Sequence, residues 1–205
     1  MIKISLTSLL TYSAKVSKSA KIKYVRDTKT GGPYSPAIDH WKQLRDAIKK
    51  MHENNLPVES LKELLEVVSQ IKIKNYSRAI NEYIRFINKN EVVYFPVGKA
   101  YWTHSDDLLV SSSPELGLII NGNKYYVKIF YKKKDKDTKV IKRNINSILT
   151  LMQLAKKDFE VDPNAKFAVL NLQNGKLIVA SPPNPDDVFE LEIEADDFIN
   201  TWNKL

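Results

Sequence analysis

The chain has 205 residues, a net charge of +8 and no cysteine. Hydrophobic residues make up 43% and charged residues 27%, which is ordinary for a globular protein and excludes wholesale disorder. The lack of cysteine excludes disulfides, thiolate nucleophiles and cysteine-type zinc sites, and no apolar run approaches the ~18 residues of a membrane span. We expect one domain over residues 1–205, in a cytoplasmic protein with no signal peptide and no membrane partner.

The charge is unevenly distributed along the chain. Residues 1–50 contain 11 Lys/Arg and 3 acids, residues 121–145 contain 9 and 2, and residues 181–205 contain 1 Lys and 7 acids. A basic patch of this kind can meet nucleic acid or another anionic surface. The more ordinary interpretation of a lysine-rich, arginine-poor chain is a solvated face, which the acidic C-terminal end partly neutralises.

Apolar residues recur with helical spacing through residues 1–90, so we expect this part to be mainly helical. Leu6, Leu9 and Leu10 share one side of a short helix. A short polar–apolar alternation then predicts a strand, and a Gly-Gly-Pro sequence predicts a loop. In chain order the predicted elements are a helix over 4–14, a strand over 21–26, a loop over 27–35, and helices over 36–55 (with Asp39 as N-cap), 60–70 and 76–88.

Strand patterns dominate residues 91–205. Pro96 and Gly98 interrupt the first strand, so it is predicted to be bent or at an edge. Asn121-Gly122 marks a hairpin turn, because both central positions of a type I′ turn need positive φ, and a second hairpin is predicted around Asn174-Gly175. The acidic end carries Phe198, Ile199 and Trp202, which predict a last helix docked on the body. The predicted strands are 92–102, 108–113, 116–120, 125–132, 166–172 and 176–180; residues 132–139 form a charged loop and 140–157 the longest helix.

These elements predict a mixed α/β (α+β) fold: N-terminal helices, then a mixed, largely meandering sheet flanked by helices. Residues 108–132 form its centre, as three meandering strands joined by a Pro-Glu corner and an Asn-Gly turn. In the third strand Lys128 shares one face with Tyr126 and Phe130, while Val127 and Ile129 point to the other face.

Residues 76–180 run helix, three strands, long helix, strand, strand, with Pro114-Glu115 after the first strand of the meander and Lys128 on its third strand. This order resembles the PD-(D/E)XK (restriction endonuclease-like) nuclease superfamily. The resemblance implies a restriction endonuclease-like core in which Glu115 is a metal-binding catalytic acid and Lys128 the catalytic lysine. It also implies Mg²⁺ as the cofactor if catalysis survives, because the ion polarises the phosphate and lowers the pKa of a water.

The sequence departs from that pattern at the second acid. The position two residues before Lys128 holds Tyr126, so Glu115 stands as a single carboxylate where two or more are usual in the superfamily. An acid that migrated to Asp106, Asp107, Asp135 or Asp137 would restore the set. The sequence Pro114-Glu115-Leu116-Gly117 followed by residues 127–132 (VKIFYK) is also similar to a group of uncharacterised bacterial proteins with no assigned activity.

The residues of this centre also have structural interpretations. Pro114-Glu115 is typical of a plain turn, and Lys128 on an alternating strand can pair with Glu115 across the sheet. A lysine run is more often a solvated loop than a phosphate clamp. If the region binds nucleic acid, the candidate contacts are the basic residues that follow the third strand: Lys132, Lys133, Lys134, Lys136, Lys139 and Arg143.

Three hypotheses follow, in this order of preference. The first is a protein that binds DNA or RNA on a nuclease-like fold with lost or reduced catalysis. The second is a protein-interaction or regulatory module, acting with a protein partner or as a homodimer, in which the acidic residues 186–197 partly cover the basic patch. The third is an active Mg²⁺-dependent nuclease, which requires a second carboxylate within reach of Glu115.

Overall fold

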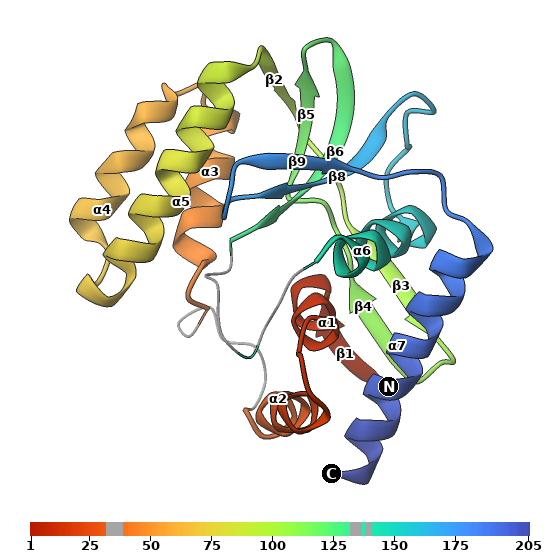
Figure 1. Ribbon diagram of the computed structural model, residues 1–205. Coiled ribbons are helices and arrows are strands. Elements are labelled where there is room, and N and C mark those ends of the chain that lie inside the picture. The colour runs from red at the N-terminus through yellow and green to blue at the C-terminus, as the bar shows by residue number, and fades with distance from the viewer. Residues whose placement is uncertain (32–38, 132–136, 138–140) are drawn as a thin grey trace.

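The structure is a computed structural model, which describes residues 1–31, 39–131, 137 and 141–205. It has a mixed α+β fold, built on two mixed β-sheets with helices packed around them (Figure 1). The predicted fold class is therefore confirmed at the level of helices with mixed sheets. Among the helices of the described residues, none is both long and apolar enough to cross a membrane.

The larger sheet has five strands in the order β2-β5-β6-β8-β9. Its first three strands form an antiparallel meander, β6 and β8 are parallel, and β9 returns antiparallel to β8. The predicted turn between β5 and β6 is confirmed, because Asn121 and Gly122 have φ of 48° and 79°. The bounds are β2 Val92–Phe95, β5 Leu116–Ile120, β6 Asn123–Phe130, β8 Lys166–Asn171 and β9 Lys176–Val179.

The smaller sheet has four strands in the order β1-β4-β3-β7. The N-terminal strand β1 (Ile2–Ser5) pairs in parallel with β4 (Leu108–Ser111), which pairs antiparallel with β3 (Ala100–His104). The two-residue strand β7 (Lys156–Lys157) completes the sheet beside β3. The start of the chain is thus tied to its middle by main-chain hydrogen bonds.

Helices cover both faces of the five-stranded sheet (Figure 1). One face packs against α3 (Lys42–Glu53), the 3₁₀ helix η1 (Val58–Glu63) and α5 (Gln70–Lys89), with α4 (Leu64–Val67) beside them. The other face packs against α1 (Leu6–Ser13) and α6 (Lys142–Leu154), and α7 (Pro185–Lys204) packs on these two helices. The predicted alternation of β6 is confirmed, since Tyr126 and Phe130 are buried on the α1–α6 side and Val127 and Ile129 on the α3–α5 side.

The predicted strand over residues 21–26 is wrong, because these residues lie inside helix α2 (Lys18–Thr30). Ser17 caps the helix by accepting the N–H of Ala20 at 3.2 Å. Residues 21, 24, 25 and 28 are the less exposed ones and share one helical face, which packs on α1 and α7. Only two of them are strongly apolar, so the helical period was weak and the short alternation misleading.

The predicted meander over residues 108–132 is also wrong in one respect, because β4 belongs to a different sheet from β5 and β6. Ser112 N–H donates to Ala100 O, and Ala100 N–H donates to Ser113 Oγ, so the end of β4 stays with β3. Pro114 then has no N–H with which to continue a ladder. The Pro-Glu corner is the point where the chain passes from one sheet to the other.

Other elements differ from the prediction in bounds or type. The helix predicted over 140–157 as the longest is the 13-residue α6, whereas α5 and α7 have 20 residues each. The helix predicted over 36–55 begins at Lys42, and Asp39 is not its N-cap, although Asp39 Oδ1 accepts the N–H of Trp41. The helix predicted over 60–70 is instead η1 followed by the short α4. The strand predicted over 92–102 is divided into β2 and β3. Part of the loop predicted over 27–35 and most of the charged loop over 132–139 lie outside the described residues.

Candidate functional site

Glu115 and Lys128, the two residues singled out by the sequence, lie together in the structure. Lys128 Nζ donates to Glu115 Oε1 at 2.8 Å, where the ends of β5 and β6 meet. Their side chains are only 17% and 16% exposed. The main chain fixes the two residues side by side, because Glu115 N–H also donates to the carbonyl oxygen of Val127, the neighbour of Lys128, at 2.9 Å. The predicted cross-strand pairing is therefore confirmed, and it brings the acid and the lysine into direct contact.

The second oxygen of the Glu115 carboxylate is engaged as well. Glu115 Oε2 accepts the main-chain N–H of Ile129 at 2.7 Å. The chain leaves the sheet at Pro114, so the carboxylate supplies an acceptor where the strand partner ends. Both carboxylate oxygens therefore have a strong donor inside the protein.

A second cation reaches Glu115 from helix α3. Arg45 Nε lies 3.9 Å from Glu115 Oε1, while the other end of the guanidinium donates to Asp39 Oδ2 at 2.6 Å. Burial works to lower the pKa of Arg45, but the hydrogen bond to Asp39 and the charge of Glu115 outweigh it and raise that pKa. Sequence reasoning missed Asp39 and Arg45 here, because they lie some 70 residues upstream of Glu115 in a helical region with no motif.

Aromatic rings close the site on the α3–α5 side. The indole of Trp41 stacks between the rings of Tyr76 and Tyr131, with centroid distances of 5.6 and 5.5 Å. Burial raises the pKa of Tyr131, and the nearby Glu115 carboxylate raises it further. The Tyr131 hydroxyl is buried and finds no hydrogen-bond partner within the part of the chain that the structure describes. The site is therefore walled by packed rings.

A small cavity adjoins Lys128. The cavity bordered by Lys128 and its neighbours on α1 and α6 has a volume of about 10 Å³. Such a volume holds a water molecule at most. The cluster contains two carboxylates, Asp39 and Glu115, and two cations, Arg45 and Lys128, so its formal charges balance. It has the geometry of a structural ion-pair network inside a packed wall.

Tyr126, which stands where the superfamily pattern has its second acid, belongs to the hydrophobic core. Its ring packs against Phe95, Phe159 and Phe167. Its hydroxyl accepts the N–H of Asp162 at 3.1 Å. The position therefore contributes packing between β2, β6 and β8, and a carboxylate there would be buried among rings.

The candidate migrated acids do not complete a metal site among the described residues. Asp106 and Asp107 lie in the turn between β3 and β4, on the other sheet, where Asp107 O accepts the N–H of Ile2. Asp137 O accepts the N–H of Val16, and Asp135 lies outside the described residues. Across residues 1–31, 39–131, 137 and 141–205, no group of three or more His, Cys, Asp or Glu is placed to hold a metal ion.

Gly117, the last residue of the Pro-Glu-Leu-Gly sequence, has a packing role. A Cβ at this position would lie 2.3 Å from Cε2 of Phe95 and 2.6 Å from the Phe95 carbonyl oxygen. The neighbouring strand β2 can therefore pair with β5 only because residue 117 has no side chain. This part of the motif serves sheet assembly.

The predicted nucleic-acid contacts fall mostly outside the described residues. Lys132, Lys133, Lys134, Lys136 and Lys139 are not described, and Arg143 alone is placed. Arg143 Nε donates to Glu190 Oε2 of α7 at 2.9 Å, with 64% of its side chain exposed. Arg143 therefore already has an acidic partner at the surface.

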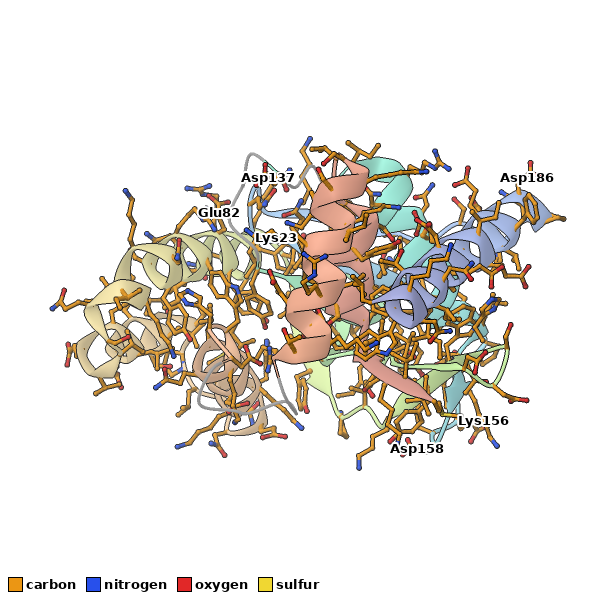
Figure 2. The ribbon with its side chains drawn as sticks, turned by 90° about the horizontal axis from the view of Figure 1, so that it is seen from below. Lys23, Glu82, Asp137, Lys156, Asp158 and Asp186 are labelled. Atoms are coloured by element: carbon orange, nitrogen blue, oxygen red, sulfur yellow. The ribbon has the colours of Figure 1, made fainter. Side chains whose placement is uncertain are left out.

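Helix α2 carries basic residues that the sequence did not assign to a site. Its exposed residues include Lys18, Lys23, Arg26 and Lys29, and Asp27 is its one acid. Figure 2 shows α2 in front when the molecule is seen from below, with Lys23 on it and α7 beside it. The sequence did not indicate this basic face, because in the predicted strand over 21–26 the side chains of Lys23 and Arg26 would point to opposite sides.

The acidic helix α7 packs along α1, α2 and α6. Asp197 Oδ2 accepts from the Tyr12 hydroxyl at 2.8 Å and from Lys21 Nζ at 3.2 Å. Burial raises the pKa of Glu194, whose carboxylate accepts the hydroxyl of Ser13 at 2.6 Å. The acidic end thus neutralises the inner edge of α2, while the outer basic residues stay exposed. No protein-family model and no curated protein matches the chain at a significant level.

Proposed function

We propose that the protein binds nucleic acid through a basic face that includes α2, and that its nuclease-like centre is a structural ion-pair network without catalysis. The observation that carries the proposal is the set of exposed Lys and Arg residues on α2, whose start lies beside Asp137 and Asn144. Val16 N–H donates to Asp137 O at 3.4 Å, and Asn144 Nδ2 donates to Ser13 O at 3.2 Å. Ser13 and Val16, which precede α2, therefore contact Asn144 and Asp137.

The composition of α2 supports a phosphate-binding role. Its 13 residues, KSAKIKYVRDTKT, contain five Lys or Arg and one Asp. Several exposed cations on one helix attract the phosphate backbone and release its counterions, which makes binding strong at low salt and weak at high salt. Lysines contact phosphates and do not by themselves distinguish bases. We therefore expect binding along α2 to depend little on nucleotide sequence.

The order of elements supports the nuclease-like frame of the proposal. Helix α5, strands β5 and β6, helix α6 and the parallel strand β8 follow one another in the order that the resemblance implies, whereas β4, the strand before the Pro-Glu corner, lies in the other sheet. Glu115 and Lys128 lie on adjoining strand ends, but the cluster is charge-balanced and these two side chains are mostly buried. These features favour a protein that has a nuclease-like order of elements but no nuclease activity.

A matched pair of variants tests the proposal. Lys18→Gln, Lys23→Gln and Arg26→Gln together remove three charges from α2, and Lys50→Gln, Lys62→Gln and Lys89→Gln remove three from the ends of other helices. Binding of a fluorescent DNA or RNA oligonucleotide at low ionic strength should weaken about tenfold or more for the first variant and change little for the second. Equal losses would show that only net charge matters and would contradict an α2 interface.

A protein-interaction module remains the second candidate. The observation that favours it is the acidic helix α7, whose Asp197 pairs with Lys21 and whose Glu190 pairs with Arg143. These contacts neutralise part of the basic surface, as that hypothesis expects. Absence of oligonucleotide binding at low ionic strength, together with a stable protein complex or dimer in solution, would favour this candidate over the first.

A further inference from the structure

A hollow of about 450 Å³ lies where the two ends of the chain meet the turn between β3 and β4. Its lining comes from β1, that turn and the last turns of α7: Met1, Ile2, Lys3, Asp107, Trp202 and Asn203. Figure 1 shows the two termini close together on the side of the molecule where α2 lies. The volume is within the ~300–1,000 Å³ range of small-molecule sites, so it can accept a group the size of a nucleotide.

The hollow is lined by an aromatic ring and by two charged side chains that form no ion pair with the described residues. Lys3 and Asp107 are exposed, and neither forms an ion pair with any residue in the described part of the chain. Trp202 is partly buried and anchored by its contact with Phe198, whose ring centroid is 6.0 Å away. A fixed indole beside an uncompensated ammonium and carboxylate offers stacking, phosphate binding and a hydrogen-bond acceptor in one place.

The hollow is joined to the basic helix α2. Lys29 Nζ, near the end of α2, donates to Trp202 O at 2.9 Å and lies 5.8 Å from the centre of the indole ring. Helix α2 has 13 residues and is therefore ~20 Å long. Its exposed basic residues, Lys18, Lys23, Arg26 and Lys29, run along this length, and its last turn adjoins the hollow.

We propose that this hollow receives one nucleotide of a single-stranded nucleic acid whose backbone runs along α2. The base lies against Trp202, its phosphate lies near Lys3 and Lys29, and Asp107 accepts a hydrogen bond from an exocyclic amino group. Adenine, cytosine and guanine carry an exocyclic amino group and thymine does not, so the site disfavours thymine. A base inside a duplex is stacked and paired, which excludes it from the hollow.

This inference rests on the proposed function, and the probes are chosen to separate the two. The protein has three tryptophans, Trp41, Trp102 and Trp202, which give three indole N–H signals in a ¹H–¹⁵N spectrum. Titration with adenosine monophosphate should shift the Trp202 signal saturably and leave the other two in place. Thymidine monophosphate should bind several-fold more weakly, and Asp107→Asn should remove most of that difference.

Oligonucleotides distinguish a strand-binding site from a site for free nucleotide. An oligoadenylate decamer should bind more tightly than the mononucleotide and shift the Trp202 signal, whereas a duplex of equal length should not shift it. Lys3→Gln should weaken decamer binding about five-fold or more, and Trp202→Leu about 5- to 100-fold, with partial rescue by Trp202→Phe. The exposed Lys3 and Asp107 variants keep the test valid even if the Trp202→Leu variant does not fold.

Each outcome decides one of the two proposals. If oligonucleotides bind but the Trp202 signal does not move with decamer or mononucleotide, the hollow is not a nucleotide site and the basic-face proposal stands. If the mononucleotide shifts Trp202 but the decamer binds no more tightly, the site takes free nucleotide and single-strand recognition is overturned. If neither ligand binds, both proposals fail.

Discussion

The Lys128 ammonium lies 2.8 Å from the Glu115 carboxylate, which also accepts the main-chain N–H of Ile129 at 2.7 Å. One side chain thus joins two strand ends and holds a lysine that is 16% exposed. The residue types that the resemblance assigns to catalysis are present and adjacent, yet they satisfy one another. The contacts of Glu115 explain its presence without a reaction.

Breaking this pair should destabilise the protein. In Glu115→Gln the partly buried Lys128 loses its counter-charge, so we expect a loss of about 1–3 kcal/mol in the free energy of unfolding. Urea denaturation of Glu115→Gln, Lys128→Met and the double variant gives the coupling energy, which should be about 1 kcal/mol or more. A coupling near zero would show that the contact contributes nothing to stability.

Magnesium should neither bind at Glu115 nor support cleavage. Both carboxylate oxygens have donors, and the ammonium of Lys128 and the guanidinium of Arg45 lie where a cation would approach. Isothermal titration with millimolar Mg²⁺ should show no heat from this site, and supercoiled plasmid should stay intact with Mg²⁺ or Mn²⁺. Cleavage that disappears in Glu115→Gln would instead establish an active nuclease.

Stability should fall in mild acid because of His52. Burial lowers the pKa of His52 from 6.5 to about 4, and its Nε2 shares a hydrogen bond of 2.6 Å with the Tyr83 hydroxyl. The unfolded chain therefore binds a proton more readily than the folded chain between pH 6.5 and 4. The stability contributed by neutral His52 is complete above pH 6.5 and is lost as the pH falls toward 4.

The size of this effect is about 3 kcal/mol, from the difference between the folded and unfolded pKa. Urea denaturation at several pH values checks it, with His52→Gln as the control, since an amide keeps a hydrogen-bonding group near Tyr83 without titrating. The variant should lose less stability than the parent between pH 6.5 and 4. Parallel pH profiles for the two proteins would rule out His52 as the source.

Gly117→Ala should disturb the pairing of β2 with β5. The added methyl group would collide with the ring and the carbonyl oxygen of Phe95, at a cost of about 1–3 kcal/mol. Thermal or urea unfolding measures the loss. Adding Phe95→Leu removes the ring contact but not the carbonyl contact, so the double variant should recover part of the stability; an unaffected Gly117→Ala would contradict the close approach.

Local signals with a direct physical cause were predictable from the sequence. The Asn121-Gly122 turn, the period of α5 and α6, the Asn174-Gly175 hairpin and the docking of α7 through Phe198 and Ile199 all follow from residue type and spacing. The pairing of Glu115 with Lys128 was predictable as one of two interpretations, because their strands adjoin an Asn-Gly turn that sets the register.

Long-range relationships were not predictable in this way. Nothing near Ile2 indicates that it pairs with Leu108, and no local pattern brings Arg45 and Asp39 to Glu115. The change of sheet at Pro114 depends on where Ser113 finds its partner, Ala100, which is a tertiary contact. Helix α2 was missed because its inner side includes the partly buried Lys21 and Thr28, whose position depends on packing against α1 and α7.

The salt dependence of oligonucleotide binding tests the central claim most directly. Fluorescence anisotropy of a labelled oligonucleotide across a range of KCl concentrations gives the slope of log affinity against log salt. We predict a negative slope of about 3 or steeper for the parent protein, reduced by about 2–3 when Lys18, Lys23 and Arg26 are changed to Gln. No binding at the lowest salt concentration, or an unchanged slope in that variant, would contradict a nucleic-acid interface on α2.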